Sequence, residues 1–181
     1  LNGALAREAP DAFDANNLTV GANLERPLMR HLTAGYGAGY RLSQVDRLGQ
    51  QETYGLVFTP GFLQWDNRND PLDATSGHYA NLTLAPYVDT LGSGANFLRG
   101  QIQGQTYWTA ESLPATPTLA LRFVTGLISG ASPNAVPADL RFYAGGGGSV
   151  RGYAFQSIGP RDAANDPTGG NSWVEFSAET R

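Results

Sequence analysis

Apolar and polar residues alternate along much of this chain, which is the period-2 pattern of β-strands. Within residues 17–25, Leu18, Val20 and Leu24 share one face, and polar or small residues lie between them. The same pattern predicts further strands over residues 32–43, 51–62, 79–88, 98–108, 119–127 and 173–179, with a weaker one over 1–8. The sequence therefore predicts an all-β antiparallel meander of about eight strands, with long irregular connections only at 9–16 and 130–168.

The two faces of these strands differ in polarity. We expect the apolar face to carry Leu18, Leu24, Tyr36, Leu56, Leu82, Ile102 and Phe123. We expect the opposite face, rich in Gln, Gly, Arg and Glu, to meet water through Thr19, Arg41, Gln101, Gln103 and Glu179. Several strands approach the roughly nine to eleven residues that a tilted strand needs to cross a bilayer. This combination favours an antiparallel transmembrane β-barrel whose apolar face meets lipid.

A soluble ligand-binding β-barrel or sandwich is the alternative all-β fold. Its apolar face would point inward, and its solvent face would carry more Lys and Glu than this chain supplies. The stretch 99–105 is too rich in Gln for a soluble core, and Trp65, Tyr87 and Trp108 near strand ends match the aromatic girdles of membrane barrels. The pattern therefore favours the membrane barrel.

The composition narrows the function class further. A net charge of −4, with 12 Lys and Arg scattered along 181 residues, argues against nucleic-acid binding. The chain has no Cys, which excludes disulfides and thiolate metal sites but leaves the redox compartment open. It also lacks a run of about 18 apolar residues, the length of a transmembrane helix. With 23 Gly, 8 Phe, 8 Tyr and 3 Trp, the composition fits one β domain.

A glycine-rich stretch interrupts the alternation. Gly145–Gly148 would weaken any helix or strand, since each glycine loses much backbone freedom on ordering. The sequence Val150-Arg151-Gly152-Tyr153 follows directly. A long loop with one Arg can fold back against a wall and place the guanidinium on carboxylates there. We expect Gly152 to allow close approach, with Val150 and Tyr153 packing beside Arg151.

Other kinds of site fit poorly. The four glycines lack the Gly-Lys-Ser/Thr sequence and the helix of a phosphate-binding loop. A nucleophilic Ser149 would need a base, and neither His31 nor His78 lies in a recognisable nucleophile or metal motif. The Asp residues of 66–73 lack the spacing of a calcium loop. We therefore predict that the protein is not an enzyme and has no cofactor or metal site.

The glycine-rich stretch also resembles a known family. The run Phe142–Tyr153, followed by a Gly-Pro pair and an acidic strand, resembles the sixth extracellular loop and the next strand of the BamA and TamA superfamily. The resemblance implies that Arg151 reaches into the barrel lumen and pairs with acidic residues on the wall, here Glu179 and Glu175. It also implies a structural loop anchor formed by Val150, Arg151, Gly152, Tyr153, Gly159 and Pro160.

Two further motifs extend the resemblance. The run Asp70–Gly77 resembles a periplasmic turn of these barrels, with Ala74 where the family usually has a proline. The run Pro137–Tyr143, which leads into the glycines, resembles the TamA branch, the outer-membrane subunit of the translocation and assembly module.

The resemblance implies a partial barrel in the bacterial outer membrane. Residues 1–181 would form a single partial β-barrel domain, the fifth to twelfth of about sixteen strands. Residues 66–77 would form a periplasmic turn and 130–168 a long extracellular loop. Two open sheet edges and an uncovered apolar face would favour self-association of such a piece.

The function implied is assembly or translocation of other outer-membrane proteins, autotransporters especially. The expected partners are outer-membrane lipid, these client proteins and a periplasm-spanning inner-membrane partner such as TamB. A two-partner secretion pore of the same superfamily is the alternative within this fold.

Overall fold

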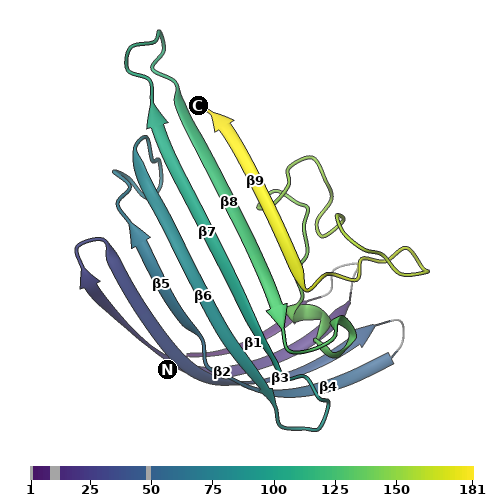
Figure 1. The fold of residues 1–181 in the computed structure, drawn as a ribbon. Helices are drawn as coiled ribbons and strands as arrows, with labels where there is room; N and C mark the ends of the chain where they lie inside the picture. Colours follow the sequence, from purple (N-terminus) through teal and green to yellow (C-terminus); the bar gives the residue numbers. More distant parts are fainter. Residues whose placement is uncertain (1, 9–12, 48–49) are drawn as a thin grey trace.

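The computed structural model describes residues 2–8, 13–47 and 50–181, and nearly all of its regular structure is β-strand (Figure 1). The strands are β1 (Asn2–Glu8), β2 (Asp14–Met29), β3 (Leu32–Arg47), β4 (Gln50–Phe58), β5 (Gly61–Asp66), β6 (Gly77–Asp89), β7 (Phe97–Thr109), β8 (Thr118–Ser129) and β9 (Ser172–Thr180). Two single 3-10 turns, η1 (Pro133–Ala135) and η2 (Ala138–Leu140), lie between β8 and β9. Over the described ranges, no helix is long and apolar enough to cross a membrane.

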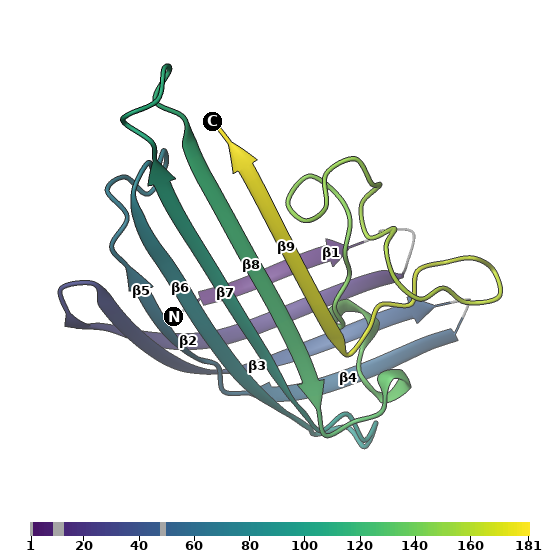
Figure 2. The same ribbon diagram turned by 45° about the horizontal axis from the view of Figure 1, so that its top comes forward.

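All nine strands belong to one antiparallel sheet that follows the order of the chain. The order is β1-β2-β3-β4-β6-β7-β8-β9, and β5 pairs with β3 and β6. The sheet curves until β1–β4 pass behind β7–β9, and the β8–β9 loop lies on its concave side (Figure 2). The predicted all-β antiparallel meander is confirmed, and the described residues form an open curved wall and not a closed barrel.

Two predicted boundaries are wrong. The single strand expected over 51–62 is divided into β4 and β5, because Pro60 has no N–H to donate to the sheet. The register continues across the break: Phe58 lies opposite Gly39, and Gly61 lies opposite Tyr36. The two strands therefore occupy one position in the sheet, which keeps eight positions in the meander.

The other wrong boundary is the connection expected over 9–16. Strand β2 already begins at Asp14, and Arg7 of β1 reaches across to its carboxylate at 2.8 Å. Leu1 and residues 9–12, which the predicted first strand and connection include, lie outside the described residues.

Two glycines of β3 leave room for aromatic rings of the neighbouring strands β4 and β5. A Cβ on Gly35 would overlap the ring of Phe62. A Cβ on Gly39 would lie 2.6 Å from the Phe58 ring and 2.8 Å from the backbone oxygen of Val20. These glycines therefore leave space for the rings on the concave side, where Phe58 also stacks on Tyr87.

The convex face carries most of the residues expected on the apolar face. Six of them are between 37% and 67% exposed: Leu18, Leu24, Tyr36, Leu82, Ile102 and Phe123. The residues expected on the polar face lie on the concave side, where they pair across the sheet: Thr19 with Arg41, Gln101 with Gly126, Gln103 with Val124, and Glu179 with Ala120. An apolar exterior and a polar interior are the inverse of a soluble barrel, as the lipid-facing interpretation predicts.

Leu56 is the exception, and its predicted placement on the apolar outer face is wrong. It pairs with Arg41 on the concave side and is 0% exposed. The hydrophobic core of the described residues also lies on this side, and it consists of Phe13, Ala15, Val45, Tyr54, Leu56, Ala95, Phe97, Ile128, Val136, Ala138 and Phe142. The last three come from the β8–β9 loop, which covers the inner wall and makes an apolar residue favourable there.

We predict that replacing Gly39 by Ala destabilises the protein by about 1–3 kcal/mol, because the added methyl group overpacks against a ring and a backbone oxygen. The matched control is Gly104→Ala in β7, where an added Cβ meets nothing within 4 Å. Denaturant unfolding of both variants in detergent measures the difference. Equal stabilities would contradict the close packing at Gly39.

The faces can be mapped with single cysteines, since the chain has none of its own. We expect Ile102→Cys to react with a membrane-soluble maleimide in liposomes, and Gln103→Cys to react with a charged, water-soluble one. Leu56→Cys should react with neither while the protein is folded, because this position is buried. Labelling of Leu56→Cys from the membrane would contradict its inward orientation.

Candidate functional site

The β8–β9 loop is rooted in the core on the concave side of the sheet. Val136 and Ala138 of its first part are buried, and so is Arg141. The Arg141 guanidinium donates to the backbone oxygen of Val136 at 2.9 Å and to that of Thr168 at 3.0 Å. Because Thr168 is near the end of the loop, these bonds tie its entry to its exit.

Phe142 docks the root of the loop onto the wall. Its ring covers Gly126 of β8, where a Cβ would overlap it. It stacks on Trp173 of β9, with 5.5 Å between centroids, and the guanidinium of Arg99 in β7 lies 4.3 Å from its centre. Its backbone exchanges two 2.9 Å hydrogen bonds with Gly170. Three strands thus form the slot for this one ring.

The tip of the loop places Arg151 on β9. Its guanidinium donates to the carboxylate of Glu179, and its side chain stays 72% exposed. Glu175 is buried and does not contact Arg151: its carboxylate accepts from Ser149 and lies 3.4 Å from Arg122. The structure therefore brings Arg151 to one of its two expected partners, and Ser149 of the same loop to the other.

The neighbours of Arg151 contribute in different ways. Val150 is half-buried and lines the cleft of about 360 Å³ between the loop and β9. Tyr153 is 60% exposed, so most of its side chain is not packed against the protein. Gly152 has a φ of +88°, and an added Cβ would meet nothing within 4 Å. The positive φ therefore favours glycine at position 152. The expectation that Gly152 allows a close approach is wrong, because the space beside it is open.

Gly159 and Pro160 lie in a second lobe of the loop. Gly159 has a φ of +135°, and the Pro160 oxygen accepts from the Thr168 N–H at 2.9 Å. Arg161 donates to the backbone oxygens of Ser157 at 2.8 Å and Asn165 at 2.6 Å. These bonds close the lobe on itself, away from the Arg151 contact.

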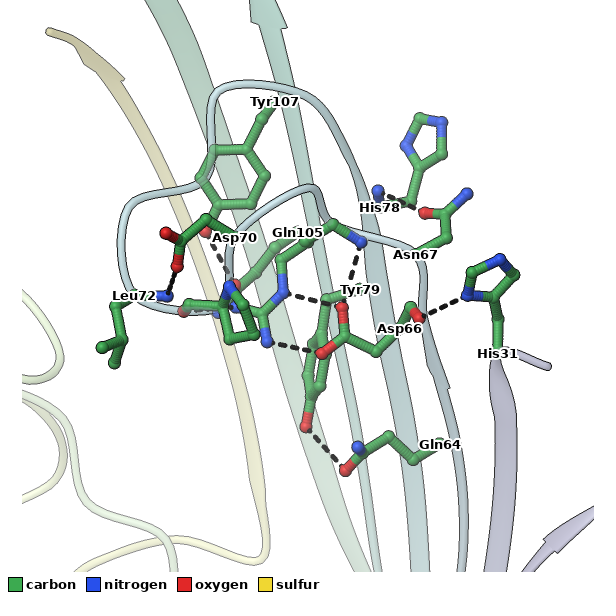
Figure 3. A network of polar contacts seen from close by, with 12 residues as sticks. His31, Gln64, Asp66, Asn67, Asp70, Leu72, His78, Tyr79, Gln105 and Tyr107 are labelled. Atoms are coloured by element: carbon green, nitrogen blue, oxygen red, sulfur yellow. Dashed lines mark hydrogen bonds and ion pairs between the residues drawn. The ribbon is translucent and has the colours of Figure 1, made fainter.

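The turn between β5 and β6 is a separate polar network (Figure 3). Two nitrogens of Arg68 donate to the Asp66 carboxylate at 2.9 and 2.7 Å, and the guanidinium lies 4.8 Å from the centre of the Tyr79 ring. The hydrogen bonds with Asp66 raise the pKa of Arg68, so this cation persists at all relevant pH values. Leu72 at the tip is 96% exposed. The base of the turn is therefore held by these contacts, and its tip is exposed.

The contacts that hold the root of the loop could not be predicted from the sequence. Asp139 in η2 accepts from Arg41 of β3 at 2.5 Å, and its side chain is 0% exposed. The only available signal was a positive charge on the polar face of a predicted strand, which does not identify a partner 98 residues away. Phe142 belongs to the glycine-rich motif, but the sequence does not show that its ring docks the loop on Gly126 and Trp173.

The chain has detectable relatives. Residues 3–181 match the model of the Omp85 superfamily domain. A SAM50-like protein of Schizosaccharomyces pombe is 28% identical over 174 residues, which cover 96% of this chain and 34% of that protein. The fold is similar to the crystal structure of BamA from Haemophilus ducreyi lacking POTRA domains 1–3, with a TM-score of 0.79, at 18% identity over 97% of this chain and 40% of that one.

The fold match agrees with the curved antiparallel wall. The chain spans about a third of the length of the yeast relative and two-fifths of the BamA structure. The match to the family model, in contrast, covers nearly all of this chain, residues 3–181. The chain therefore belongs to the Omp85 superfamily.

Proposed function

We propose that the protein carrying this chain inserts or translocates other outer-membrane proteins, autotransporters in particular, as a TamA-type subunit of a translocation and assembly module. The observation that carries the proposal is the docked loop: in an Omp85 sheet, the Arg151 guanidinium lies on Glu179 at the concave side. The run Pro137–Tyr143, which leads into the four glycines, supports the TamA branch.

In this proposal, the chain supplies a wall and the loop that braces it. Clients would add strands to an open sheet edge elsewhere in the barrel, because unpaired backbone N–H and C=O groups template a new strand. A docked loop limits changes in the curvature of the wall while the client strand pairs. No step of this process needs bond chemistry from the chain, so the proposed role is not enzymatic.

The membrane placement follows the same proposal. Residues 1–181 form part of a single barrel in the bacterial outer membrane, with the turn 66–77 on the periplasmic side and the loop 130–168 outside. The open tip of the turn, with Leu72 exposed, suits a side that faces periplasmic partners such as TamB. The convex apolar face suits contact with outer-membrane lipid.

Depletion of the full-length protein from its host tests the proposed function. We expect the surface level of autotransporters to fall, while lipoproteins of the same membrane, as the control, keep their level. Quantitative mass spectrometry of purified outer membranes measures both. Selective loss of one secreted soluble protein would instead indicate a two-partner secretion pore, and recovery of the protein from membranes without detergent would indicate a soluble barrel.

A variant of the loop tip tests the role of the Arg151 anchor. An exposed ion pair contributes up to about 1 kcal/mol, so Arg151→Ala should lower the ratio of docked to undocked loop up to about fivefold, with little change in global stability. We expect client assembly to slow accordingly. Arg7→Ala is the matched control, since it removes an equally exposed ion pair, with Asp14, in which no residue of the loop takes part. Equal assembly rates in the two variants would refute a special role for Arg151.

A further inference from the structure

A second ion pair holds the loop, and it is buried. The Arg41 guanidinium on β3 donates to Asp139 Oδ2 at 2.5 Å, and the side chains are 18% and 0% exposed. The Ser43 hydroxyl lies 3.2 Å from the same Asp139 oxygen and 2.6 Å from Oδ1 of Asn17 on β2. Asp139 thus enters a polar site on β2 and β3, far in sequence from the loop that carries it.

The segment after Asp139 contacts strands β7 and β8, which lie across the concave face from β3. The next residue, Leu140, accepts from Arg99 of β7 through its backbone oxygen at 3.1 Å. Phe142 then fills the slot at Gly126 of β8. Four consecutive residues therefore connect β3 with β7 and β8 across the concave side, where the curved sheet brings these strands to face each other (Figure 2).

We propose that Asp139 is the positioning residue of the β8–β9 loop: its ion pair with Arg41 braces the loop root between β3 and the β7–β8 wall and so holds Arg151 over Glu179. The inference deepens the proposed function and rests on it for its biological meaning. It adds a residue that pairs with Arg41 and not with Glu179, and that acts through the placement of the loop.

The energetics of buried pairs favour a positioning role over a simple gain in stability. Taking two charges out of water costs much of what their attraction returns, whereas loss of one partner leaves an uncompensated buried charge. Here Nε of Arg41 and Oδ1 of Asp139 have no hydrogen-bond partner among the described residues. The site therefore accommodates this ion pair, although two of its buried polar atoms make no hydrogen bond. Such a contact favours one position of the loop over others.

Hydrogen exchange on the full-length protein tests the proposal without any client. In Asp139→Asn, we expect exchange to rise at least about tenfold at the amides of Phe142 and Gly170, which bond each other in the root. Exchange should also rise at Gly146, whose N–H bonds to Tyr153 beside Arg151. Asp66→Asn is the control: it weakens an ion pair at the β5–β6 turn and should leave all three amides unchanged.

A double variant separates positioning from the cost of an unpaired charge. Arg41→Met/Asp139→Asn removes both charges, so the melting temperature should return toward that of the wild type while the three amides keep exchanging fast. Return of slow exchange in the double variant would overturn the proposal, because the single variant would then report only the unpaired Arg41. Unchanged exchange in Asp139→Asn, or a rise confined to Phe142 and Gly170, would overturn it as well. If Asp139→Asn does not fold, the double variant alone decides by the same criterion.

The exchange result and the depletion result fail independently. Fast exchange in these variants, combined with normal client levels after depletion, would refute the proposed function and support the positioning role of Asp139. Slow exchange in the variants, combined with loss of clients after depletion, would refute the positioning role of Asp139 and support the proposed function.

Discussion

The burial of the loop root against the concave face is the constraint on which the rest of the structure depends. A sheet that exposes its apolar residues outward has mostly polar groups inward, and it cannot form a core by itself. Val136, Ala138 and Phe142 supply the missing layer, and Leu56 of the wall packs with them. The molecule therefore combines an apolar exterior with a small buried apolar core where the loop covers the wall.

This root and the exposed tip differ in physical character. Asp139, Arg141 and Phe142 are held by buried contacts with both sides of the sheet and with the loop exit. Arg151 makes an exposed ion pair, which is worth little unless the chain already lies in place. A buried root makes a weak contact at the tip effective, because the loop no longer spends conformational entropy in reaching Glu179.

Curvature is what lets the loop bridge the wall. The rings of Phe58 and Phe62 lie over Gly39 and Gly35, and Pro60 between the two phenylalanines has no N–H to donate to the sheet. Glycine, proline and aromatic residues in these positions bend the sheet without changing its register. A flat sheet would leave β3 and β7 too far apart for one short segment to contact both.

The sequence by itself determined the strands, their order and most of their orientation, since alternation is local and each strand reports its own two faces. It also marked the glycine-rich loop and Arg151, because such a motif is contiguous. Only the tertiary structure decided that Leu56 points inward and that Asp139 meets Arg41, because both depend on which distant segment covers that part of the wall. The local pattern of a strand carries no information about a loop residue 98 positions away that folds back onto it. Where such a loop buries the polar face of a strand, an apolar residue becomes favourable on that face.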